Sequence, residues 1–129
     1  MVLCDHFKGF IFFYRICIYN IEILISKIMT IQKFMTIHLE EIKEMIKKKL
    51  PKDKFDSHEF IRSFAKEFEA AYVGFLSNYN GNNHRTVHSQ IANGLRKNME
   101  YLKIQKNGKR ISETVFGRNV SNQEWIKIN

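Results

Sequence analysis

The fold expected for this chain is decided by the stretch RTVHSQIANGLRKN, residues 85–98. Val87, Ile91 and Leu95 recur at helical spacing, so they predict a helix over 86–98 with one side turned to a core. Gly94 lies beside them and would allow close approach to the preceding helix. The opposite side of the predicted helix is polar or basic and holds no acid; it carries Ser89, Gln90, Asn93, Arg96 and Lys97.

Downstream of this helix the pattern becomes extended. Two runs of strand-forming residues flank Asn107-Gly108. Asn-Gly between such runs is a strong signal for a tight hairpin turn, because both residues tolerate a positive φ. We therefore expect a β-hairpin over 101–116, with Lys106, Lys109 and Arg110 around its tip.

Upstream, two further helices are expected. The first covers 37–50, with an apolar stripe of Leu39, Ile42, Met45, Ile46 and Leu50. The second covers 57–79 and begins with a capping box formed by Asp56 and Glu59. Its aromatic side chains share one side, which favours a core role over a stacking platform. The predicted fold class is mainly α with a small β-hairpin.

The tail after Phe116 holds Trp125, the only tryptophan. This side chain is expected to pack on the core, although stacking on a base or a dimer contact are alternatives.

The charge is concentrated at one end of the chain. The 129 residues carry 21 Lys+Arg and 13 Asp+Glu, a formal net charge of +8. Residues 1–34 contribute +2, residues 35–84 are neutral and residues 85–129 contribute +6. A local basic surface of this kind favours a polyanionic partner, most often nucleic acid.

The N-terminal segment, residues 1–34, differs from the rest because it is rich in Phe and Ile. Charged residues interrupt it too often for a membrane span, and no signal-peptide cleavage pattern is present. Three explanations remain: an over-long start, a helix that packs on the domain, or a membrane-surface anchor. Cys4 and Cys17 both lie here, so the single domain predicted over 35–129 has no cysteine and suits the cytoplasm.

No catalytic constellation is evident, so we expect no enzyme, no cofactor and no small-molecule substrate. His84 and His88 have a spacing seen in metal sites, but no third ligand accompanies them. No metal site is therefore predicted.

Three predicted helices followed by a basic hairpin resemble the winged helix-turn-helix family in element order, over about 37–116. The resemblance implies binding to double-stranded DNA, with the helix 86–98 in the major groove and the hairpin tip 106–110 on the backbone. The residues it implies for the contact are Arg85, Ser89, Gln90, Asn93, Arg96, Lys97, Lys106, Lys109 and Arg110.

Such a protein would be a transcriptional regulator or a mobile-element protein, and a homodimer is possible. The alternative is a non-catalytic adaptor or structural domain whose basic surface docks an acidic protein. RNA is less favoured, because no aromatic pair stands among the basic residues of the hairpin.

Overall fold

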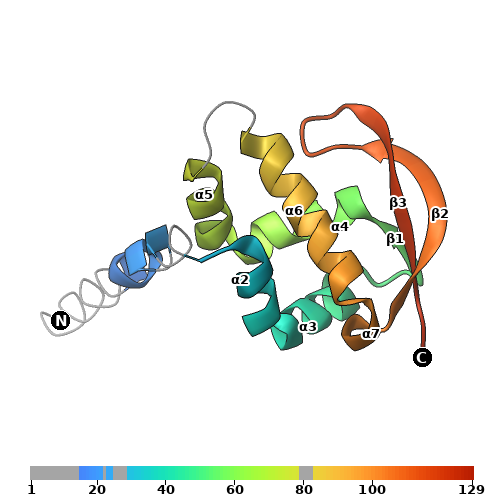
Figure 1. The fold of residues 1–129 in the computed structure, drawn as a ribbon, viewed down its shortest axis with the longest axis horizontal. Helices are drawn as coiled ribbons and strands as arrows, with labels where there is room; N and C mark the ends of the chain where they lie inside the picture. Colours follow the sequence, from blue (N-terminus) through green and yellow to red (C-terminus); the bar gives the residue numbers. More distant parts are fainter. Residues whose placement is uncertain (1–14, 22, 25–28, 79–82) are drawn as a thin grey trace, which may run out of the picture.

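The computed structural model describes residues 15–21, 23, 24, 29–78 and 83–129. It is mainly helical, with a small open three-stranded antiparallel sheet at one side (Figure 1). This layout is compatible with a winged-helix arrangement. The elements are α2 (Ile31–Ile37), α3 (Leu39–Lys49), β1 (Lys54–Asp56), α4 (Ser57–Glu67), α5 (Glu69–Ser77), α6 (Asn83–Lys97), α7 (Met99–Leu102), β2 (Ile104–Glu113) and β3 (Asn119–Lys127).

The first predicted helix, 37–50, is in fact the shorter helix α3, and a separate helix α2 precedes it. The chain bends at His38, whose ring packs on Phe34 with 4.2 Å between the ring centroids. The predicted apolar stripe is confirmed, because Ile42, Met45 and Ile46 of α3 are buried. Helix α2 adds Ile31, Phe34 and Met35 to the core. The core thus begins upstream of the domain boundary expected between residues 34 and 35.

The second predicted helix, 57–79, is divided into α4 and α5 at Phe68, which has φ −115° and ψ 49°. The Phe68 ring packs on Phe64 and Phe34, at 5.0 and 5.4 Å between centroids, so the bend places an aromatic side chain against the core. The predicted capping box is confirmed: Asp56 Oδ1 accepts from the Glu59 amide, and Glu59 Oε2 accepts from the Asp56 amide. The predicted core role of the aromatic stripe is also confirmed, as Phe60, Phe64 and Phe75 are buried. Tyr79 lies outside the described residues.

The third predicted helix, 86–98, is α6 and begins earlier, at Asn83. The Asn83 side chain accepts from the His84 amide and donates to the Leu76 carbonyl, so it supports the first turn of the helix. Val87, Ile91 and Leu95 are fully buried, as predicted. Gly94 does allow a close approach, but to α2 instead of the helix 57–79, since a Cβ at Gly94 would lie 2.1 Å from Met35 Sδ.

A hairpin does follow the helices, but the bounds predicted for it, 101–116, and its predicted turn at Asn107-Gly108 are wrong. Tyr101 and Leu102 belong to α7, and β2 continues through Asn107-Gly108 as far as Glu113. The turn lies at 114–118, where Gly117 has φ +79° and the Gly117 amide donates to the Thr114 carbonyl. Lys106 faces Trp125 while Lys109 faces Gln123, so β2 holds one extra residue at Asn107-Gly108. Gly108, at φ +83°, fits this β-bulge.

Burial of Trp125 explains why the chain forms the longer hairpin. β3 is the central strand, paired with both β1 and β2, and Trp125 lies opposite Phe55 of β1. The expected core position of Trp125 is confirmed, and its indole Nε1 donates to Ser57 Oγ at 3.0 Å. Ile104, at the start of β2, is buried with it. Pairing 104–113 with 119–127 therefore brings the last aromatic side chain onto the core.

The helical residues 15–21 lie to one side of the remaining elements (Figure 1). Ile16, Tyr19 and Ile21 are exposed there, as is Cys17. Residues 1–14, including Cys4, lie outside the described part of the chain. Among the residues that the structure describes, no helix is long and apolar enough to cross a membrane.

Candidate nucleic-acid interface

Helix α6 lies across the molecule, with α2 and α5 on one side and the sheet on the other (Figure 1). Its buried side chains fix its rotation, so that the acid-free side predicted from the sequence faces outward. Arg85, Ser89, Arg96 and Lys97 are exposed, while Gln90 and Asn93 are partly buried. Most of the residues predicted on this helix are therefore accessible to a partner.

Three of these side chains have partners within the protein. Gln90 accepts from the Gln32 side chain at 3.2 Å through Oε1, and its carbonyl accepts from the same group at 2.8 Å. Asn93 Oδ1 accepts from Arg96 Nε and Nη2 at 3.0 and 2.6 Å. Gln90 thus belongs to the contact between α2 and α6, whereas Asn93 and Arg96 form a pair on the open surface.

The basic residues predicted at the hairpin tip lie elsewhere. Lys106, Lys109 and Arg110 are in β2, because the turn is at 114–118. Arg110 approaches three carboxylates: Asp56 at 3.4 Å, and Glu59 and Glu124 at 3.8 Å each. Asp56 is fully buried, so Arg110 balances a charge inside the protein. The basic side chain at the true turn is Arg118.

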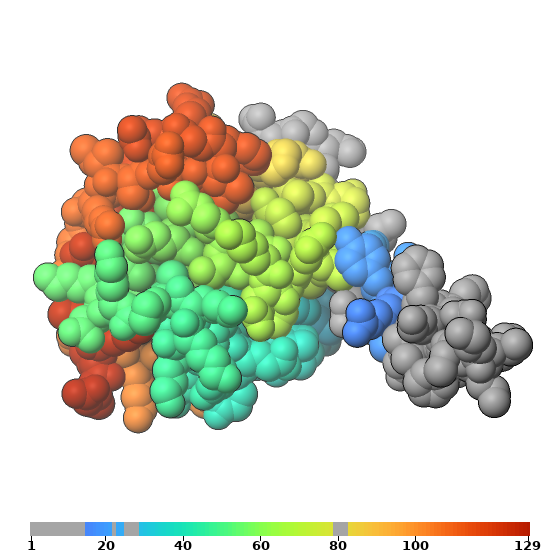
Figure 2. Space-filling model, turned by 180° about the vertical axis from the view of Figure 1, so that it is seen from behind, coloured from blue at the N-terminus to red at the C-terminus, as the bar shows by residue number. Residues whose placement is uncertain are grey.

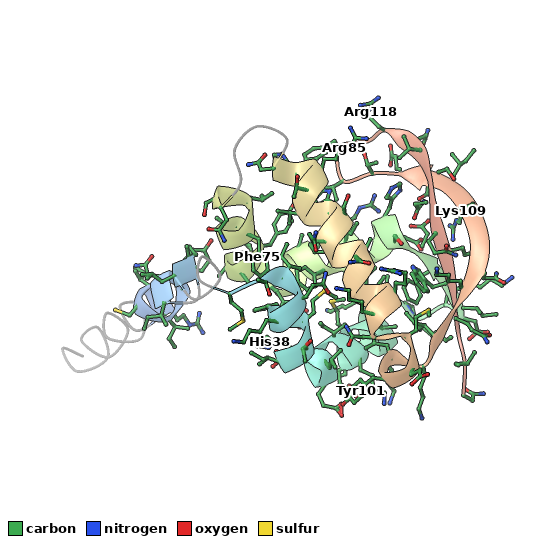
Figure 3. All side chains as sticks on the ribbon, in the orientation of Figure 1. His38, Phe75, Arg85, Tyr101, Lys109 and Arg118 are labelled. Carbon is green, nitrogen blue, oxygen red and sulfur yellow. The ribbon has the colours of Figure 1, made fainter. Side chains whose placement is uncertain are left out.

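A groove of about 910 Å³ lies between the hairpin, α6 and the start of α4. Arg85 comes from α6, Lys109 from β2 and Arg118 from the turn, and all three line this groove. Figure 3 shows Arg85 and Arg118 at the same end of the molecule. His58, His84 and His88 also line it, and no Asp or Glu occurs among the described lining residues. The groove is consequently suited to anions.

Aromatic contacts join the turn to α6 along one wall of the groove. The Phe116 ring lies edge-on to His84 at 4.8 Å and nearly parallel to His88 at 6.0 Å between centroids. His88 in turn stacks on Tyr72 of α5, and its Nε2 is 2.7 Å from the Tyr72 hydroxyl. The turn is thereby held against the first half of α6.

Burial, together with the nearby charges of His84 and His58, lowers the pKa of His88 to about 4. His88 is thus neutral at pH 7. Burial also raises the pKa of Tyr72, so its hydroxyl keeps its proton at pH 7. This wall is therefore uncharged at His88, and the positive charge of the groove comes from its Lys and Arg side chains.

The hairpin is fixed to α4 by a polar network on the other wall. The His58 amide donates to Asn122 Oδ1 at 3.1 Å, and His58 Nδ1 lies 3.0 Å from Ser112 Oγ. Asn122 Nδ2 also donates to Ser112 Oγ at 3.0 Å. Seen from behind, the hairpin (orange to red) and α4 (green) form part of one continuous surface (Figure 2).

Comparison with known proteins adds no relative. No protein-family model, curated protein or solved structure matches the chain. Any functional assignment therefore depends on the groove and on the exposed side of α6.

Of the residues that line the groove, only Arg85, Ser89 and Lys109 were predicted from the sequence as contacts. The residues that were not predicted include His58, His84, Phe116 and Arg118. Arg118 and Phe116 would have been found if Gly117, and not Gly108, had been taken as the turn glycine. The spacing of His84 and His88 in the sequence is one seen in metal sites, but it does not indicate that both side chains line the groove. Within the described residues, no group of three or more His, Cys, Asp or Glu side chains is placed to hold a metal ion.

Proposed function

We propose that this protein binds double-stranded DNA, with α6 in the major groove and the turn 114–118 beside it on the backbone, as in winged-helix proteins. One observation carries the proposal. Arg85 at the start of α6 and Arg118 in the turn line the same groove, together with Lys109. Cations from the helix and from the hairpin thus form one surface, which is what a contact along a phosphate backbone requires.

The exposed side of α6 provides chemistry for reading bases. Ser89, Asn93 and Arg96 have the side-chain types that bond base edges in the major groove. Asn93 Oδ1 is occupied by Arg96 in this structure, so bidentate recognition of adenine by Asn93 requires Arg96 to swing away. Arg96 is then free to bond guanine or phosphate, and Lys97 adds a further cation.

The net charge of residues 85–129 also favours a polyanionic partner. Residues 85–129 carry nine Lys+Arg and three Asp+Glu. Two of those acids, Glu113 and Glu124, lie on the hairpin, and Glu124 is engaged by Arg110. The remaining positive charge attracts polyanions and speeds their association at low salt.

The test measures binding of the full chain to a labelled random duplex of about 20 base pairs by fluorescence anisotropy, at NaCl concentrations between about 50 and 300 mM. Binding should fall steeply with salt. Arg85→Ala and Arg118→Ala should each weaken binding and reduce the slope of log K against log salt by about 0.9. Asn93→Ala should instead alter base preference among defined sites.

Lys47→Ala is the matched control, since Lys47 is exposed on α3 and does not line the groove. It removes the same charge, so it should leave the slope unchanged if the contact is local. Absence of salt-dependent duplex binding would contradict the proposal and favour an acidic protein as the partner.

A further inference from the structure

The groove contains an exposed aromatic surface that a duplex contact does not explain. Phe116 lies in the turn, and its side chain is 59% exposed although one edge faces His84. Val115, next to it, is also exposed and lines the same groove. Aromatic rings held open to solvent beside cations are typical of sites where unpaired bases stack.

Three cationic side chains line the same groove as this ring. Arg118 lies two residues after Phe116 in the sequence, and Arg85 lies directly after His84. Both of these arginines line the groove, as do the two rings. Lys109 reaches the groove from β2. The hydroxyl-bearing residues Ser89 and Thr114 also line it. An aromatic ring with phosphate-binding groups around it matches a nucleotide, which joins a flat base to a phosphate.

The size of the groove points to the same class of ligand. Its volume of about 910 Å³ falls within the range of small-molecule sites, about 300–1,000 Å³. A base inside a duplex is paired and stacked, so it reaches such a site only when it leaves the helix or stands at an unpaired end.

We propose that this groove binds one unpaired nucleotide, with its base on Phe116 and His84 and its phosphate held by Arg85, Lys109 and Arg118. This inference rests on the proposed function, because it assumes that the surface binds DNA. It adds that the groove within this surface holds an unpaired nucleotide. The nucleotide comes either from an unpaired strand end next to the bound duplex or from solution as a free mononucleotide.

The experiment compares four probes with the full chain. A blunt duplex and the same duplex with an overhang of about five thymidines are measured by anisotropy, at equal salt. Thymidine monophosphate and inorganic phosphate are then compared by their effect on the NMR signals of the His84 and His88 rings. The variants are Phe116→Ala, the aromatic replacement Phe116→Trp, and Ile111→Ala. Ile111 serves as control because it is 74% exposed on the same hairpin and does not line the groove.

For a strand end, the natural protein should prefer the overhang by about fivefold or more. Phe116→Ala should abolish the preference, measured as the ratio of the overhang affinity to the blunt-duplex affinity of the same variant, while Phe116→Trp and Ile111→Ala should keep it. For a free nucleotide, thymidine monophosphate should shift the histidine signals where inorganic phosphate does not, and Phe116→Ala should remove that shift.

Equal affinity for blunt and overhang duplexes, together with no nucleotide-specific shift, overturns the inference even where duplex binding is salt-dependent. Failure of the proposed function is a separate result, namely no salt-dependent binding of the blunt duplex.

Discussion

A β-carbon built on Gly94 of α6 would lie 2.1 Å from the sulfur of Met35 on α2. Met35 is fully buried, so the two helices touch at a point where one of them has no side chain. The contact sets the position of α6, and therefore the position of the exposed residues Ser89 and Arg96 on it.

The effect of Gly94→Ala on the free energy of unfolding should consequently depend on whether residue 35 is Met or Ala. In the natural protein the end of the Met35 side chain must shift to admit the new Cβ, which costs about 1–3 kcal/mol and offsets the gain of about 1 kcal/mol in helix propensity. In Met35→Ala the new methyl group has room, and Gly94→Ala should stabilise the fold. Urea denaturation of the four proteins should give a coupling free energy above about 0.5 kcal/mol. Additive effects would show that the two residues do not touch.

Ser57→Ala should remove the only hydrogen-bond acceptor found for the Trp125 indole among the described residues. A buried donor left without a partner costs about 1–3 kcal/mol of unfolding free energy. In Trp125→Phe, which lacks that donor, the same substitution should cost much less. Ser121→Ala, at an exposed position of β3, is the control and should change little.

His88 should make the stability of the fold depend on pH. Its pKa in the folded protein is about 4, below its ordinary value of 6.5, so the unfolded chain takes up a proton first on acidification. Its contribution is therefore complete above pH 6.5 and is lost as the pH falls towards 4. Chemical denaturation at several pH values in this window should show the decline, and His88→Asn should flatten it. An unchanged decline in that variant would place its origin in other groups.

Arg110→Ala and Arg118→Ala should affect different properties, namely stability for Arg110 and DNA binding for Arg118. Arg110 lies among Asp56, Glu59 and Glu124, so its loss should reduce stability by about 1–2 kcal/mol and leave the salt slope of DNA binding unchanged. Arg118 is exposed in the turn, so its loss should affect binding with little change in stability. Thermal melts and anisotropy on the same samples test both expectations. A reduced salt slope in Arg110→Ala would mean that Arg110 contacts phosphate after all.

Truncation into α2 should show how much this helix contributes to the core. A chain that begins at Met29 keeps Ile31 and Phe34 in the core, whereas one that begins at Met35 loses both. Each large buried side chain contributes about 2–5 kcal/mol, so the shorter chain should melt far lower or fail to fold. Circular dichroism melts of the two proteins measure the difference. Equal melting temperatures would mean that α2 is dispensable.

Local patterns were sufficient where the spacing of apolar residues decides the outcome. The buried sides of α3 and α6, and the capping box at Asp56, follow from residues close together in the sequence. The break at Phe68 does not, since it depends on the fit of that ring against Phe34, which comes from a different helix.

The hairpin failed for a similar reason. Asn107-Gly108 has the local chemistry of a tight turn, and Gly108 does take a positive φ. That conformation serves a bulge, because the longer pairing with β3 buries Trp125 and Ile104. The local sequence around Asn107-Gly108 does not show how much burying Trp125 and Ile104 stabilises the longer pairing, because the residues that pair are far apart in the sequence. The groove between the hairpin, α6 and α4 depends on the same pairing, so only part of its lining could be predicted.

The position of β3 has a consequence for how the protein is made. β3 is the middle strand of the sheet, yet it lies near the C-terminal end of the sequence and pairs with β1 from the first half. Helices formed during synthesis have no completed sheet to pack on until this strand leaves the ribosome. Phe55 and Ser57 therefore gain their contacts with Trp125 only after β3 has been made, so the sheet is among the last parts of the fold to form.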